Sequence, residues 1–252
     1  MDIGQAALLA GIGVIGGVWN AIGGGATLFT FPALMAAGLP PVVANATNYV
    51  ALLPSNAAAL PAYRAELRAL GRELLPLLAV SGAGALIGSL LLLTSDPDVF
   101  AALIPFLILA ATLLFAFGAR INAALVSLAG TGGSGIAAFA LLFASSIYGG
   151  YFGADLGIIL LAIAQIMDHS DFHVANGIKN LLATSFTILS IVIFGFGGLI
   201  AWPEAFAMMA GATAGGYFGG RLARRVNQRF LRLAVTAFGF CLSAVYFART
   251  FG

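Results

Sequence analysis

The chain alternates between long apolar runs and short breaks that contain glycine, proline or charged residues. Two runs, 3–39 and 136–167, are longer than one membrane crossing requires, and each is interrupted by glycines. The remaining runs have about the 20 residues of a single transmembrane helix, and they are 42–63, 74–93, 99–119, 172–196, 203–222 and 230–247. The pattern therefore predicts an all-α polytopic membrane protein.

Charged residues are too scarce for a protein surrounded by water. They make up 8% of the 252 residues, whereas an ordinary soluble domain carries about 25%. The surroundings of the chain must therefore be mostly lipid. The arginines are scattered between apolar runs and form no patch interleaved with aromatic residues, so we expect no nucleic-acid partner.

The same order of segments occurs twice, as one broken run followed by three simple helices. At a spacing of 131 residues, several segments match, and these are Val43-Ala44-Asn45 with Val174-Ala175-Asn176, Gly84 with Gly215, and Gly88 with Gly219. Such internal similarity predicts a duplicated fold. We expect residues 1–119 to form the first membrane repeat and 120–252 the second, with the paired glycines packing helices together.

The charges predict that the two repeats are inverted relative to each other. The loop after the third helix contains Asp96 and Asp98 and no basic residue, whereas the equivalent loop near 221–232 contains five arginines. Short basic loops stay in the cytoplasm, so the equivalent loops lie on opposite faces. Inversion requires an odd number of crossings in each half. A re-entrant hairpin in each broken run satisfies this requirement, while a full crossing by the first arm remains an alternative.

The two breaks are the predicted substrate site. Half-helix N-termini inside a membrane direct N–H groups and a positive dipole end toward anions. The first break contains Gly23, Gly24 and Gly25, and a half-helix begins after it near Ala26 and Thr27. We expect these N–H groups and the Thr27 hydroxyl to bind a small anion, with a glycine kink for close packing as the alternative.

The second break contains Gly153 and Asp155. An ionisable side chain inside the membrane is a functional candidate by default, so Asp155 could carry a proton and couple transport to it. The same carboxyl could instead cap the half-helix that begins at Leu156. The two roles are compatible with each other.

Polar residues at the start of the next helix form a second candidate group in each half. Asn45, Thr47 and Asn48 occupy the first half, and Asn176, Lys179 and Asn180 the second. Lys179 is the only lysine, and a buried ammonium is costly unless it is paired, which suits an anion site. Reaching toward the headgroups, or pairing with Asp171, would explain it equally well. At the spacing of 131 residues its equivalent is Asn48.

Other chemistry is not indicated. His169 and His173 lie in a short loop with Asp168 and Asp171. Without a cysteine their spacing is a weak metal signal, so we expect a solvated loop and no metal. The glycine-rich segment 130–135 lacks the Gly-Lys-Ser/Thr ending of a nucleotide-binding loop. The sequence shows no nucleophile and base at membrane depth, and we expect neither an enzyme nor a cofactor.

Several segments in order resemble the TauE/SafE sulfite exporter family. They are Gly16 to Pro32, Leu39-Pro40, Ala44 to Thr47, Gly149 to Gly153, Val174 to Asn180 and Gly215 to Ala223. The resemblance covers nearly the whole chain and implies a permease for small sulfur anions in the bacterial inner membrane. Position 155, commonly small in that family, is Asp here.

The sequence thus predicts a multi-pass secondary transporter that exports sulfite, an organosulfonate or a related small anion. The anion would bind at the midplane between the two hairpin tips. An uptake permease or channel for another small anion is the main alternative, and a membrane scaffold that transports nothing is a second one. A homodimer is compatible with the sequence.

Overall fold

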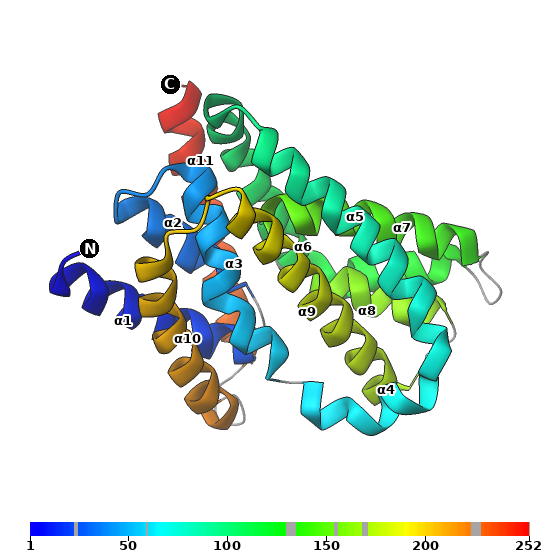
Figure 1. The fold of residues 1–252 in the computed structure, drawn as a ribbon. Helices are drawn as coiled ribbons and strands as arrows, with labels where there is room; N and C mark the ends of the chain where they lie inside the picture. The colour runs from blue at the N-terminus through cyan, green and yellow to red at the C-terminus, as the bar shows by residue number, and fades with distance from the viewer. Residues whose placement is uncertain are drawn as a thin grey trace.

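The computed structural model describes residues 1–22, 25–58, 60–129, 135–153, 156–167, 171–222 and 228–251, and the regular elements of this part of the chain are all helices (Figure 1). The elements in order are α1 Ile3–Ile22, α2 Thr27–Ala36, α3 Pro41–Ala57, η1 Leu60–Tyr63, α4 Arg64–Leu70, η2 Gly71–Glu73, α5 Leu74–Thr94, α6 Pro97–Ala129, α7 Gly135–Phe152, α8 Gly157–Ile166, α9 Phe172–Phe196, α10 Trp202–Leu222 and α11 Gln228–Phe251. Six described segments are long and apolar enough to cross a membrane, which confirms the predicted all-α polytopic class.

The order of the helices is repeated along the chain. α2 begins at Thr27 and α8 at Gly157, 130 residues later. α3 begins at Pro41 and α9 at Phe172, and α6 begins at Pro97 and α11 at Gln228, in both cases 131 residues later. The spacing agrees with the one found in the sequence.

Each broken run consists of one long helix and one short helix. The long arms are α1 with 20 residues and α7 with 18. The short arms α2 and α8 have 10 residues each, which is roughly 15 Å of helix against a hydrocarbon core of about 30 Å. The second arm of each broken run is therefore too short to cross the membrane.

Two predicted boundaries were wrong. The run 42–63 is not one helix, because α3 ends at Ala57 and the chain continues through η1 into the short helix α4. The run expected to end at residue 119 continues as α6 to Ala129. Arg120 is exposed, so its long side chain can stay in contact with water and does not end the helix.

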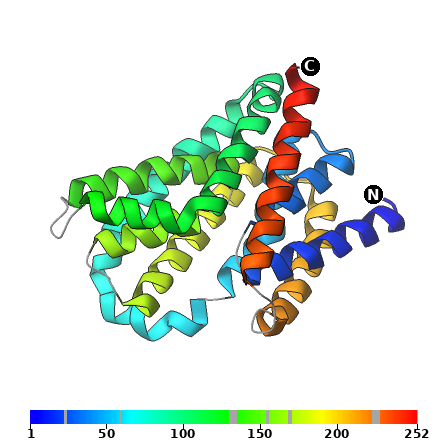
Figure 2. The ribbon, with the colours of Figure 1, turned by 180° about the vertical axis from the view of Figure 1, so that it is seen from behind.

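The first long helix of each half of the chain packs against a helix of the other half. α1 of the first half packs along α10 of the second, and α7 of the second half packs along α5 of the first (Figure 1). The α1–α10 pair and the α5–α7 pair lie on opposite sides of the molecule in both views (Figure 2). The last helices of the two halves, α6 and α11, also pack against each other.

Glycines bring these helix backbones into direct contact. A Cβ atom on Gly215 would collide with the carbonyl oxygen of Val14, and one on Gly88 with that of Ile147. Gly84 would place a Cβ 2.6 Å from the carbonyl oxygen of Phe143. The helix-packing role predicted for Gly84, Gly88 and Gly215 is thus confirmed, while the side-chain surroundings of Gly219 lie outside the described part. Small residues let membrane helices approach closely enough for extensive van der Waals contact.

The central helices α3 and α9 run antiparallel. Thr47, near the start of α3, binds the N–H of Ala201 just beyond the end of α9. Gly177, near the start of α9, would place a Cβ 3.2 Å from that of Tyr63, just beyond α3. The end of α5 lies beside the connection from α9 to α10, because Leu93 packs directly on Gly197. The start of α10 therefore lies near the end of α5.

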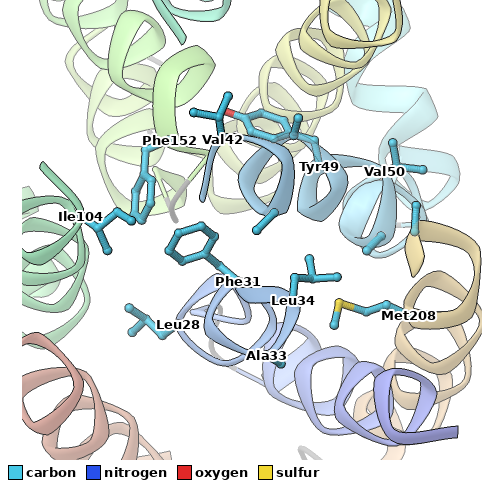
Figure 3. Close-up of a cluster of buried hydrophobic side chains, with 14 of the residues drawn as sticks. Leu28, Phe31, Ala33, Leu34, Val42, Tyr49, Val50, Ile104, Phe152 and Met208 are labelled. Carbon is cyan, nitrogen blue, oxygen red and sulfur yellow. The ribbon is translucent and has the colours of Figure 1, made fainter. Parts of the chain in front are cut away.

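The largest core cluster joins both halves of the chain. Figure 3 shows Phe31 of α2 facing Phe152 of α7, with Ile104 of α6 beside them. The two rings form an edge contact with centroids 5.5 Å apart, an arrangement that adds to the gain from burial. α7, the long arm of the second broken run, therefore packs against α2, the short arm of the first, close to both breaks.

The membrane topology can be tested by cysteine labelling in a Cys241→Ala background, since Cys241 is exposed. Asp96 and Arg68 are exposed residues near opposite ends of α5, and Asn227 is the equivalent of Asp96 at the 131-residue spacing. We expect Asp96→Cys to react with an impermeant thiol reagent from outside, and Arg68→Cys and Asn227→Cys from the cytoplasm. Reaction of Asp96→Cys and Asn227→Cys from the same side would contradict inversion.

The neighbouring glycines 215 and 216 form a matched pair for testing the α1–α10 contact. Gly215→Ala should lower the free energy of unfolding by about 1–3 kcal/mol, because its methyl group collides with the α1 backbone. Gly216→Ala meets its nearest atom at 3.9 Å and should be neutral or slightly stabilising, since alanine favours helix. Thermal unfolding in detergent measures both variants. If the two variants had the same free energy of unfolding, the close backbone contact between α1 and α10 would not contribute to stability.

Candidate functional site

The first break joins α1 to α2 through a left-handed glycine. Gly25 has φ +81°, a conformation that L side chains rarely adopt, and a Cβ there would lie 3.4 Å from Phe115 and Val235. Ala26 and Thr27 follow and are buried. The N–H groups from Leu28 onward donate to carbonyls from Gly25 onward. An anion held by this half-helix would therefore use the amides before Leu28. Gly23 and Gly24 lie outside the described residues.

The second break also begins with a left-handed glycine. Gly153 has φ +68°, and a Cβ there would lie 2.6 Å from the ring of Tyr49. The Tyr49 hydroxyl donates a hydrogen bond to the carbonyl of Gly149, one turn earlier in α7. The end of α7 is thus fixed against α3. Asp155 lies outside the described residues, and its role as proton carrier or cap stays a prediction.

The first half of α3 contacts both breaks. The Asn48 side-chain Nδ2 lies 3.4 Å from Thr27 Oγ1, at the first break. The Asn45 Nδ2 donates to the carbonyl of Tyr151 at 2.9 Å, at the second. Asn45 is 0% exposed and Asn48 2%, so this is an enclosed polar centre within an apolar core. Polar residues inside the membrane are costly, so two buried amides beside the breaks are candidates for a functional site.

The side chain of Thr47 has a different partner from those of Asn45 and Asn48. Its Oγ1 accepts a hydrogen bond of 3.0 Å from the N–H of Ala201, in the connection between α9 and α10. This contact holds the end of α9 against the start of α3. The hydroxyl thus has a structural partner, and its role in substrate binding stays a prediction.

The candidate residues of α9 lie at the other end of the α3–α9 pair. Asn176 is 8% exposed, and Lys179 and Asn180 are half-buried. This part of α9 lies beside η1 and α4, as the proximity of Gly177 to Tyr63 shows. Because the two helices are antiparallel, the structure does not bring this group together with Asn45 and Asn48. Its role in anion binding stays a prediction.

The start of α9 is fixed by a carboxylate cap outside the membrane-spanning segment. Asp171 accepts hydrogen bonds from the backbone N–H groups of His173 at 2.7 Å and Val174 at 3.1 Å. These bonds, that of Val174 first, lower the pKa of Asp171 below its ordinary value because they favour its charged form. The negative charge also suits the positive end of the helix dipole.

Sequence reasoning missed Tyr49 and the carbonyls of α7. Tyr49 directly follows Asn48, but it reads as one more apolar residue in the run 42–63, so no sequence pattern indicated its hydrogen bond. Asn45 and Tyr151 are 106 residues apart, and no local pattern connects them. Within the described residues, no three His, Cys, Asp or Glu side chains lie close enough together to share a metal ion.

Comparison with known proteins gives consistent matches along most of the chain. The family model for the sulfite exporter TauE/SafE matches residues 9–246. A probable membrane transporter protein of Haemophilus influenzae is 30% identical, over 97% of this chain and 96% of that protein. The probable membrane transporter protein YfcA of Escherichia coli is 28% identical over 92% and 86%, and the probable membrane transporter protein ORF9 of a Sinorhizobium species is 27% identical over 86% and 83%. No solved structure matches.

Substitution of Thr47 tests whether its hydroxyl supports the fold or the ligand. Thr47→Val removes the acceptor for the Ala201 N–H and should lower the free energy of unfolding by about 1 kcal/mol, the net value of a typical hydrogen bond. Thr47→Ser keeps the oxygen and serves as the control. Thermal unfolding measures the stability of both variants. A flux assay measures KM for the transported anion, which we expect to stay unchanged in Thr47→Val. A raised KM with unchanged stability would place Thr47 on the substrate instead.

Proposed function

The chain belongs to the sulfite exporter TauE/SafE family, and from this premise we propose that it exports sulfite or a small organosulfonate and binds it between the two helix breaks. Its relatives are membrane transporters, and the apolar helices make it a multi-pass protein of the inner membrane. The substrate and the direction of transport are the parts that this proposal adds.

One observation carries the proposed binding site. Both breaks reach the same helix, where Thr27, Asn45 and Asn48 form a buried polar centre. A helix break inside a membrane is tolerated where it lines a cavity or is buried in protein, and transporters bind substrates at such breaks. A scaffold would have no need for two breaks that converge on polar side chains.

The proposed architecture is two inverted repeats, residues 1–119 and 120–252. The antiparallel course of α3 and α9, which are equivalent helices, supports this proposal. So does the position of the end of α5 beside the start of α10, because these helices are also equivalent. Inverted repeats allow a binding site near the midplane to face either side of the membrane in turn.

The proposed binding residues extend from the breaks along both central helices. Gly23 to Thr27 and Gly153 to Asp155 would contribute the two half-helix starts, and Asn45 and Asn48 the buried amides. Asn176, Lys179 and Asn180 would line the cytoplasmic half of the route, on the side where the basic loops are expected. The Lys179 ammonium would attract an anion toward the enclosed centre.

Flux in proteoliposomes tests this function and the role of Lys179 together. We expect uptake of labelled sulfite to exceed that of sulfate, acetate and thiosulfate. Lys179→Met should raise KM for sulfite by roughly tenfold or more, because it removes a charge-assisted contact. Lys179→Arg keeps the charge, and Arg68→Gln removes an exposed charge of α4, so both should change KM less.

The possible results separate the alternatives. Absence of flux for every anion would contradict transport and favour the scaffold. Sulfite transport with an unchanged KM in Lys179→Met would place the binding site at Thr27, Asn45 and Asn48 without the lysine. Equal flux of all four anions would favour the permease or channel for other small anions.

A further inference from the structure

Asn45 and Asn48 each present a buried amide oxygen that receives no hydrogen bond. In the described part of the chain, no donor reaches Oδ1 of either residue, although both side chains are almost fully buried. Residues three apart are neighbours on one helix face, with Cβ atoms about 5–6 Å apart. An unpaired buried acceptor is costly, and two of them at the meeting point of both breaks call for a ligand that donates.

The amide of Asn45 is fixed in orientation. Its Nδ2 donates to the carbonyl of Tyr151 at 2.9 Å. A carbonyl only accepts hydrogen bonds, so a reversed amide would place two acceptors against each other. Asn45 therefore always presents its oxygen to the enclosed centre.

The amide of Asn48 can present either of its two ends. Its Nδ2 lies 3.4 Å from Thr27 Oγ1, and a hydroxyl can both accept and donate. After reversal, the Thr27 hydroxyl donates to Oδ1, and Nδ2 becomes the group that faces the centre. The two neighbouring amides thus offer one fixed acceptor and one group that can donate.

We propose that this pair of amides selects an oxyanion that carries one O–H group, so that hydrogensulfite, and not the sulfite dianion, is the transported form. The O–H donates to Asn45 Oδ1, and a charged oxygen accepts from Asn48 Nδ2. The inference rests on the proposed function and refines its substrate. The dianion is rejected because its oxygens would face the fixed Asn45 oxygen, and sites built for a donor discriminate strongly against ligands that lack it.

The proton that matters in this proposal belongs to the substrate. Three phenols lie on helices beside the pair of amides, and they belong to Tyr49, Tyr148 and Tyr151. α1, α2, α5 and α8 carry no ionisable side chain between their first and last residues. The other ionisable side chains on α6, α9 and α10 are Asp98, Arg120, His173, Lys179, Glu204, Tyr217 and Arg221. α11, which reaches the first break through Val235, carries Arg229, Arg232, Cys241, Tyr246 and Arg249. Asp155 and His173 are the protein groups that could imitate a substrate titration, so the experiment includes both.

The main test uses the unchanged protein and two anions. Flux is measured in proteoliposomes at equal pH on both sides, with labelled sulfite and with methanesulfonate, which keeps its charge but has no O–H. We expect KM for total sulfite to rise about tenfold for each pH unit above the pKa of hydrogensulfite, following its protonated fraction. KM for methanesulfonate should be higher than that for hydrogensulfite and independent of pH. The sulfite profile should keep its shape in Asp155→Asn and in His173→Gln.

A matched pair of substitutions tests Asn45 itself. Asn45→Leu should reduce the preference for hydrogensulfite over methanesulfonate by roughly tenfold or more, because it removes the acceptor. Thr184→Val is the control, since Thr184 Oγ1 is another buried oxygen without a donor in the described part, located on α9. It should keep the preference. If Asn45→Leu does not fold, the pH comparison in the unchanged protein still decides.

The inference would be wrong if KM for total sulfite stayed flat or fell as the pH rises. It would also be wrong if the pH dependence of this KM disappeared in Asp155→Asn or in His173→Gln. A requirement of flux for Na⁺ would contradict it as well, because it would place a cation on the two amide oxygens. Transport of both anions without pH dependence would contradict this inference alone. Absence of flux for both anions at every pH would contradict the proposed function and this inference with it.

Discussion

Direct contact between helix backbones is the constraint on which the rest of this structure depends. Gly215 lies against Val14, and Gly88 against Ile147, with no space for a side chain between them. In lipid, where apolar side chains gain little from leaving the solvent, such close packing is a main source of helix association. It fixes α1 to α10 and α5 to α7. The long arm before each break is therefore held by a helix of the other half of the chain.

Because α1 packs on α10 and α7 on α5, α3 lies between two helix pairs and contacts both of them. Through Asn48 it contacts Thr27, at the break that follows α1, and through Asn45 it holds Tyr151, at the end of α7. Any displacement of one pair against the other must change at least one of these contacts. The polar centre is closed in this structure, since Asn45 and Asn48 are almost fully buried. At the proposed site, an anion would therefore enter only after such a displacement or a movement of the short arms.

The sequence predicted those features that are local along the chain. Apolar runs indicated the helices, glycines indicated the breaks, and Gly84, Gly88 and Gly215 indicated helix contacts. The end of α3 at Ala57 and the continuation of α6 past Arg120 were not predicted, because hydropathy alone does not show where a helix bends or continues toward water. The hydrogen bond from Asn45 to Tyr151 joins residues 106 apart, and the partner of Thr47 lies 154 residues away. Neither contact leaves a trace in a single sequence.

The two proposed repeats differ chemically at equivalent positions. Asn48 presents a neutral amide, whereas its equivalent in the second half is the ammonium of Lys179. Because α3 and α9 are antiparallel, the neutral amide and the charge lie toward opposite ends of the helix pair. On the proposed route, an anion that approaches from the α9 end would pass the ammonium before it reaches the enclosed amides, and one that approaches from the α3 end would not. A charge of this kind changes affinity and rate on one face. It cannot set the direction of net transport, which at equilibrium depends only on the gradients of the anion and of any coupled ion.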